Sequence, residues 1–155
     1  MLTLLLILTV LSAALMVAGF MIPGAAAIVM CDHVADSVDG GSPGTFSVWT
    51  GTAPANCEAA STGTKLWECT LDNPAFGAAA DIDPGARATA AGVPKTANAA
   101  ASGTAGYGRM FNSAGVCKGQ FTVGTSGTDA ILSTTTFVSG APASLTALTL
   151  THPEV

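Results

Sequence analysis

The stretch that decides the fold is GYGRMFNSAGVCKGQFTVGTSGTDAILSTTTFVSGAPASLTALTLTHP, residues 106–153. Apolar and small polar side chains alternate along it between turn signals, and it carries almost no charge. Alternation with a period of two is typical of strands that bury one face. We expect strands at residues 107–111, 116–123, 129–135 and 145–151, with a hairpin turn at 112–115.

The same period begins upstream, after Ser42, Pro43 and Gly44. It predicts strands at residues 46–50 and 65–71, joined by a turn-rich connection. Residues 73–102 are rich in Ala, Gly and Pro and predict loop structure with one short strand at 87–90. Six or seven short strands at this spacing indicate a mainly β chain, organised as a single β-sandwich or jelly-roll-like domain over residues 44–155 and preceded by N-terminal α-helical segments.

Residues 23–41 have the pattern of an amphipathic helix. Pro23 suits a first helical position. Ile28, Cys31, Val34 and Val38 follow at three- and four-residue steps, and a Gly-Gly pair ends the pattern. We expect this helix to cover one face of the sheet.

Residues 1–22 are apolar, and the run is about as long as a bilayer-spanning helix. No Lys or Arg precedes Lys65, so the basic region of a signal peptide and the cationic flank of a spanning helix are both missing. Three interpretations stay open: a membrane or signal segment, a helix buried between subunits of an assembly, or a spurious upstream start with Met21 as the initiator.

Charged residues make up 10% of the chain, against about a quarter in ordinary soluble domains, while hydrophobic residues reach 49%. This composition favours a subunit whose neighbours cover much of its surface. The net charge is −5, and the five basic residues are scattered singly. Binding to phosphates needs clustered cations, so we expect no nucleic-acid partner.

The four cysteines, Cys31, Cys57, Cys69 and Cys117, form no C-x-x-C pair, and the two histidines lie near opposite ends of the chain. A zinc site therefore has no support. The cysteines are either buried free thiols or paired. Cys69 with Cys117 is the pair we expect first, because both fall on the apolar side of their predicted strands.

The remaining chemical motifs are weak. Asp81 and Asp83 resemble the start of a calcium loop, but the further ligands of such a loop are absent, so a turn capped by an Asp side chain is the favoured interpretation. Ser126 lies between glycines without the G-x-S-x-G spacing of a hydrolase. We expect no catalytic residues, no cofactor and no enzyme activity.

Three aromatic residues are candidates for contact with a partner. Trp49 shares one side of its strand with Ser47, which we expect to be the more exposed side. Trp67 and Phe76 are the other candidates, and each of the three is also compatible with the core. An exposed Trp on a β-face is a typical interface anchor.

Several short strings together resemble small uncharacterised structural proteins of tailed phages and prophages. They are TGTAP at residues 50–54 and NPAFG at 73–77. The third is a spaced string along 124–153, which contains GTSG, D, L, TTT, G, T, LT and P in that order. The resemblance covers residues 46–153 and implies a virion protein that contacts other virion proteins, such as the major capsid protein or tail proteins, and repeats as a homo-oligomer within the particle.

A head decoration or cement subunit is the favoured role, because the chain is small and lacks the repeats of a fibre. A tail or head-tail connector component is the first alternative. A membrane-anchored or secreted binding module, or a pilin-like filament subunit, is the second.

Overall fold

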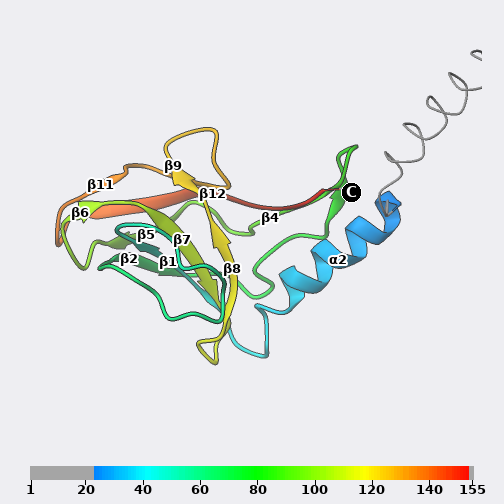
Figure 1. Cartoon of the computed structure of the whole chain (residues 1–155), viewed down its shortest axis with the longest axis horizontal. Helices are drawn as coiled ribbons and strands as arrows, with labels where there is room; N and C mark the ends of the chain where they lie inside the picture. Colours follow the sequence, from blue (N-terminus) through cyan, green and yellow to red (C-terminus); the bar gives the residue numbers. More distant parts are fainter. Residues whose placement is uncertain (1–22, 154–155) are drawn as a thin grey trace, which may run out of the picture.

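The computed structural model describes residues 23–153 and shows a mainly β chain with one helix (Figure 1). This confirms the mainly β fold predicted from the sequence. The elements in chain order are α2 (Gly24–Asp36), β1 (Thr45–Trp49), β2 (Lys65–Thr70), β3 (Ala80–Asp81), β4 (Ala86–Thr89), β5 (Lys95–Asn98), β6 (Gly103–Thr104), β7 (Tyr107–Phe111), β8 (Cys117–Phe121), β9 (Val123–Gly124), β10 (Ala130–Leu132), β11 (Thr136–Phe137) and β12 (Pro142–His152).

One sheet has four strands in the order β2-β1-β7-β8, all antiparallel. The predicted hairpin turn joins β7 to β8. Its Asn112 carbonyl oxygen accepts a hydrogen bond from the Gly115 amide at 2.9 Å, and its side-chain oxygen accepts one from the Val116 amide at 2.9 Å. Gly115 has φ +76°, a conformation that glycine adopts without a steric penalty.

A second sheet is organised around β12, the longest strand. Its order is β3-β4-β12-β10-β9, and β5 also pairs with β12. The first half of β12 pairs with β5 and the second half with β4, so this one strand spans the sheet from end to end. β6 and β11 form a separate two-stranded ribbon.

The core lies where side chains of both larger sheets and of α2 meet. Trp67 of β2 is fully buried, and its indole N–H donates to the Ala97 carbonyl oxygen of β5 at 2.8 Å. The Ala100 amide, just after β5, donates to the Leu66 carbonyl oxygen of β2 at 2.8 Å and adds a second bond beside it. Leu145 and Leu148 of β12 are fully buried as well.

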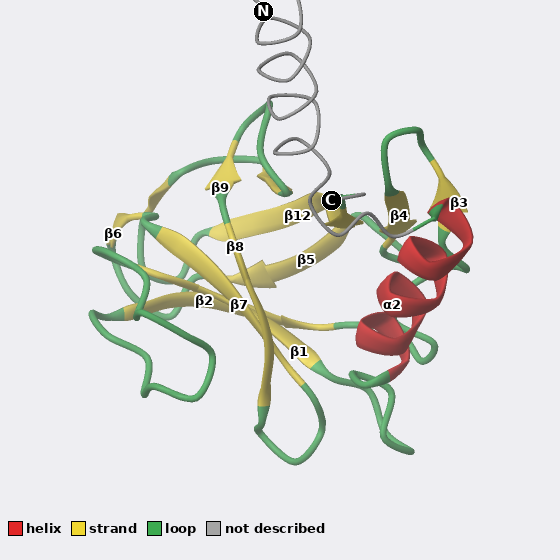
Figure 2. Cartoon of the chain, turned by 45° about the vertical axis from the view of Figure 1, so that its right-hand side comes forward, coloured by secondary structure: helices red, strands yellow, loops and turns green. Residues whose placement is uncertain are grey.

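The helix predicted within residues 23–41 is present as α2. Its buried side carries Ala27, Cys31 and Ala35, and it packs on β3, β4 and the C-terminal half of β12 (Figure 2). Small side chains also face it from β4, where Ala86 and Ala88 are fully buried. No helix within residues 23–153 combines the length and the apolar character needed to cross a membrane. Residues 1–22 lie outside the described residues.

The prediction of loop structure for residues 73–102 was wrong in part. This region contains β3, β4 and β5, of which only the position of β4 was expected. Alanine has a low intrinsic preference for strands, but β4 alternates buried alanines with the exposed Arg87 and Thr89, which suits a strand packed closely under a helix.

We expect Gly108→Ala to lower the free energy of unfolding by about 1–3 kcal/mol. A Cβ at Gly108 would overlap the ring of Phe46 and lie 3.0 Å from Cγ1 of Val123. Phe46 is fully buried and packs edge-on against Phe121, with ring centroids 5.8 Å apart, so its ring has little room to move. Urea denaturation followed by circular dichroism measures the loss.

Gly40→Ala is the matched control, because a Cβ there meets no atom within 4 Å. It should change the free energy of unfolding by less than about 0.5 kcal/mol. Equal effects for the two substitutions would contradict the packing of Phe46 on Gly108.

Candidate functional site

A row of polar side chains crosses the four-stranded sheet on the face turned away from the core. Strand register places Glu68, Ser47, Arg109 and Gln120 side by side on β2, β1, β7 and β8. Ser47 Oγ donates to Glu68 Oε2 at 2.7 Å. We call this side, which also carries Trp49 and Tyr107, the outer face.

Ser47 is fully buried and Arg109 is 1% exposed, so the expectation that Ser47 marks an exposed side of its strand was wrong. The cause is residues 50–64, the connection between β1 and β2. This connection, here called the cover segment, folds back over the outer face and is tied to it at three side chains.

Two of the three ties come from β7. The Tyr107 hydroxyl donates to the Thr62 carbonyl oxygen at 2.7 Å and accepts from the Thr62 amide at 2.9 Å. The Arg109 guanidinium donates through Nη1 to the Ala59 carbonyl oxygen and to Ser61 Oγ, both at 2.9 Å, and through Nη2 to the Cys57 carbonyl oxygen at 2.5 Å. Alternate residues of one strand therefore hold residues 57–62 of the cover segment.

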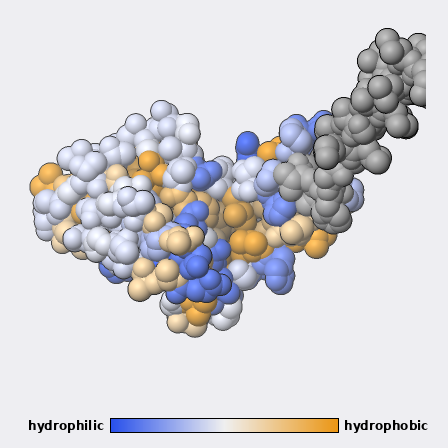
Figure 3. All heavy atoms as spheres, in the orientation of Figure 1, coloured by the Kyte–Doolittle hydropathy of each residue, from blue (hydrophilic) through white to orange (hydrophobic). Residues whose placement is uncertain are grey.

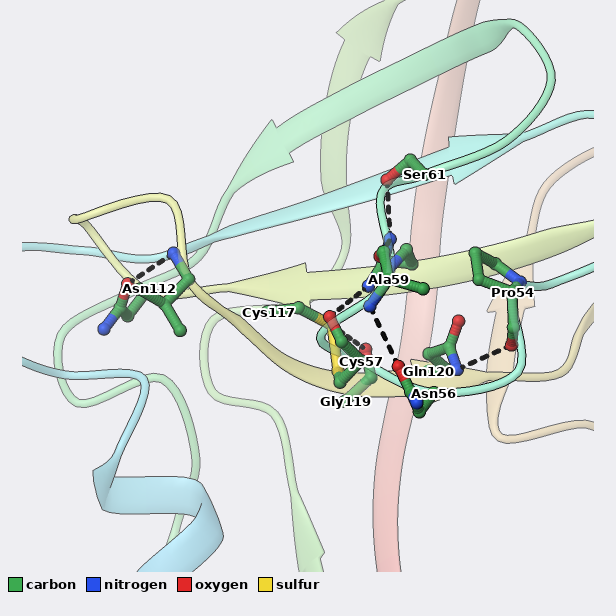
Figure 4. Close-up of a disulfide and its surroundings, with 11 residues drawn as sticks. Pro54, Asn56, Cys57, Ala59, Ser61, Asn112, Cys117, Gly119 and Gln120 are labelled. Carbon is green, nitrogen blue, oxygen red and sulfur yellow. Dashed lines mark hydrogen bonds between the residues drawn. A yellow bond between two sulfur atoms is a disulfide. The ribbon is translucent and has the colours of Figure 1, made fainter.

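The third tie comes from β8, where Gln120 Nε2 donates to the Pro54 carbonyl oxygen at 3.2 Å. A disulfide between Cys57 and Cys117 adds a covalent link between the cover segment and the start of β8, with the two Cα atoms 5.4 Å apart (Figure 4). The bond closes a loop of sequence separation 60. It fixes the middle of the cover segment to the sheet.

The predicted pairing of Cys69 with Cys117 was wrong. β2 and β8 are the two edges of the sheet, about 14 Å apart at the usual strand spacing, and a disulfide joins Cα atoms within about 7 Å. The two residues also face opposite sides. Cys69 pairs with Phe46 on the core side, whereas a register shift on β8 places Cys117 opposite Phe111 on the outer face.

Arg109 is a buried cation held by neutral groups. Within residues 23–153 the ion pairs are Lys65 with Glu68 and Lys95 with Asp72, so no described carboxylate pairs with the guanidinium. The guanidinium carbon lies 5.4 Å from the centroid of the Phe111 ring, a cation–π distance. Carbonyl dipoles and one aromatic face therefore offset the cost of burying the charge, as a carboxylate would otherwise do.

Three buried polar atoms on the outer face have no hydrogen-bond partner among the described residues: Trp49 Nε1, Arg109 Nε and Gln120 Oε1. Their clustering is unusual, because most buried polar atoms are paired. Two cavities flank the cover segment. One of about 260 Å³ is lined by Arg109, Phe111 and both disulfide cysteines. The other, of about 410 Å³, is lined by Tyr107, Gln120 and Asp129 among others.

The predicted interface residues divide between the core and the outer face. Trp67 is fully buried and Phe76 is 5% exposed, so neither is available to a partner of the folded domain. Trp67 and Phe76 are therefore core residues and not contact residues, contrary to the expectation from the sequence. Trp49 is half-buried on the outer face, and its indole N–H is not accessible.

Asp81 and Asp83 form a turn. The Asp81 carboxylate accepts a hydrogen bond from the Asp83 amide at 3.0 Å, the geometry expected of a side chain that caps its own backbone. No group of three or more metal-ligating side chains occurs within residues 23–153. The structure therefore does not bring these two carboxylates together with further ligands in the part of the chain that it describes.

Sequence reasoning did not single out Cys57, Tyr107, Arg109 and Gln120 as a set. A signal was present in β7, where Tyr107 and Arg109 alternate with the core-facing Gly108 and Met110. Polar groups at alternate positions of a strand normally indicate a solvated face. Here they indicate a face covered by backbone, which only the path of residues 50–64 reveals.

No protein-family model, curated protein or solved structure matches this chain.

We expect two unreactive thiols and one disulfide in the native protein. Burial raises the pKa of Cys69 to about 12, and burial also raises the pKa of Cys31. Both thiols stay protonated at pH 8, and the thiolate is the reactive form. Iodoacetamide at pH 8 should label no cysteine in the folded protein, two after unfolding, and four after unfolding with reduction, as counted by intact mass.

The same shift gives a pH dependence. The Cys69 thiol of the unfolded chain ionises near its ordinary pKa, whereas in the folded protein it stays protonated up to about pH 12. The contribution of Cys69 to the free energy of unfolding is therefore complete below about pH 9 and falls as the pH rises toward 12. Rapid native labelling of Cys69, or peptide mapping that links Cys69 to Cys117, would contradict the assignment.

Proposed function

We propose that this protein is a structural component of a tailed-phage virion, a decoration or cement-type subunit of the head that acts by protein-protein contact. The sequence strings along residues 46–153 support the virion assignment. The proposal includes the finer fold: the two larger sheets enclose one core as a β-sandwich, with jelly-roll-like character, over residues 44–155.

The observation that carries the contact role is an apolar surface on α2. Val29 is 67% and Met30 is 46% exposed, although both lie in the middle of a well-formed helix. With His33, Val34 and His152 they line a groove of about 360 Å³, here called the α2 patch. Contiguous exposed apolar side chains on a soluble domain mark interaction sites.

The rest of the surface suits an assembly subunit. Figure 3 shows pale, near-neutral residues over much of the visible face of the sheets, with hydrophobic residues at the surface near α2. The charged fraction of the whole chain is 10%. Two of the five basic residues are held in ion pairs and Arg109 is buried, so the surface offers no cationic cluster within the described residues for nucleic acid.

The expected partners are other virion proteins, the major capsid protein first, with the subunit repeated as a homo-oligomer in the particle. A tail or head-tail connector position is compatible with the same contacts. The disulfide specifically favours a second candidate, a membrane-anchored or secreted binding module, because disulfides persist in oxidising compartments. Virion surfaces belong to that class too, so localisation separates the two.

We expect the protein to be present in purified particles at a fixed ratio to the major capsid protein, measured by gel densitometry and mass spectrometry. Val29→Gln with Met30→Gln should weaken particle association by about 2 kcal/mol or more, the cost typical of changes at the desolvated centre of an interface, where the proposal places the α2 patch. The melting temperature of the isolated domain should barely change, since both side chains are exposed in the free protein.

Val138→Gln is the control, as Val138 is 61% exposed but lies outside the α2 patch. It should leave association unchanged. A protein recovered only from membranes or the secreted fraction, and absent from particles, would support the second candidate and overturn the first.

A further inference from the structure

We propose that the Cys57–Cys117 disulfide is a redox latch that holds the cover segment closed on the outer face, and that a dithiol reductant opens this segment while the rest of the domain stays folded. The proposal is independent of the virion assignment. It depends on three properties of the cover segment: what it buries, what it leaves unpaired, and how its disulfide is reached.

The cover segment contributes little to the hydrophobic core. None of residues 50–64 is buried, and most are exposed small or polar residues such as Ala55, Ala59 and Ala60. The buried core of the described chain contains no residue from this range. Segments with few buried apolar contacts open locally at much lower free energy than the whole fold. Opening of residues 50–64 would therefore leave the contacts of Phe46 and Trp67 in place.

The closed segment also imposes an electrostatic penalty. Arg109 is buried with no ion-pair partner among the described carboxylates, and Trp49 Nε1, Arg109 Nε and Gln120 Oε1 have no hydrogen-bond partner among the described residues. Arg109 and Gln120 both bond to the segment, so their unpaired atoms would be hydrated if it moved away, and buried unpaired polar groups are unfavourable. The hydrogen bonds from Tyr107, Arg109 and Gln120 act in the opposite direction. The non-covalent forces on the segment thus act in both directions, and in the proposed latch the disulfide holds it closed.

The disulfide is accessible to a reductant. Both cysteines are half-buried and line the open cavity of about 260 Å³ beside Arg109. Lys118 follows Cys117 directly. Nearby cations favour the thiolate leaving group in exchange reactions. Cys31 and Cys69 are buried and face the core side, so neither thiol can reach the Cys57–Cys117 bond and exchange with it.

The exchange is balanced in electrons and protons. One thiolate of the dithiol attacks a sulfur of the Cys57–Cys117 bond, forming a mixed disulfide and releasing the other cysteine as a thiolate. The second thiol of the reductant then displaces the remaining cysteine. The dithiol loses two electrons and becomes a disulfide, and two protons end on the Cys57 and Cys117 thiols. In a reducing cytoplasm the latch is open, and in an oxidising medium it closes.

Hydrogen exchange with mass spectrometry on the full chain, with and without dithiothreitol, tests the latch. Informative amides are Ala59, which bonds to Asn56 Oδ1 at 2.9 Å, and Thr62, which bonds to the Tyr107 hydroxyl. After reduction, peptides within residues 50–64 should exchange at least about tenfold faster, because local opening exposes these amides. Peptides of β1, β7 and β12 should change less than about twofold by the same argument.

Two variants complete the test. Cys57→Ser with Cys117→Ser should exchange like the reduced protein whether or not dithiothreitol is present. Cys69→Ala, which removes a thiol outside the latch, should keep the full response of residues 50–64 to reduction. Unchanged protection of the cover segment, in protein whose mass confirms reduction, would overturn the proposal. So would a simultaneous loss of protection in all strands, because the bond would then hold the entire fold rather than one segment.

Discussion

Strands β1 and β7 pair in register over five residues, with Phe46 opposite Met110, Ser47 opposite Arg109 and Val48 opposite Gly108. This pairing places Phe46, Val48 and Met110 on one face and Ser47 and Arg109 on the other. A slip of β7 by one residue would turn its side chains to the opposite faces, moving the Arg109 guanidinium into the core and Met110 under the cover segment. Both the hydrophobic core and the polar outer face therefore depend on this one register.

The outer face shows how a small domain can bury a charge without an acidic partner. Arg109 takes its acceptors from the backbone at Cys57 and Ala59 and from the hydroxyl of Ser61. A planar guanidinium with several donors suits this role better than a single ammonium group would. Because these acceptors must be brought to it, the guanidinium also specifies the path of residues 50–64, together with the disulfide at Cys57.

The two surfaces considered for function have different physical character. The outer face is polar, covered and covalently fastened, whereas the α2 patch is apolar and open. The patch exists because small residues, Ala27, Cys31 and Ala35, fill the close contact between α2 and β4, while larger apolar side chains such as Val29 and Met30 point elsewhere. Among the larger apolar residues of α2, Ile28 packs against the core, whereas Val29 and Met30 remain on the free side of the helix.

Periodicity in the sequence by itself determined the mainly β fold, the helix within residues 23–41, the positions of the longer strands and the hairpin at residues 112–115. These features are local, because alternation and turn residues act over a few positions. Tertiary structure alone decided the pairing of Cys57 with Cys117, the burial of Ser47 and the strands in the Ala-rich region. The alternation that indicated Cys69 with Cys117 is broken by a register shift at one residue of β8, and the strand order separates the two edges. Contacts of this kind depend on how distant segments meet in space, which no local pattern of side chains records.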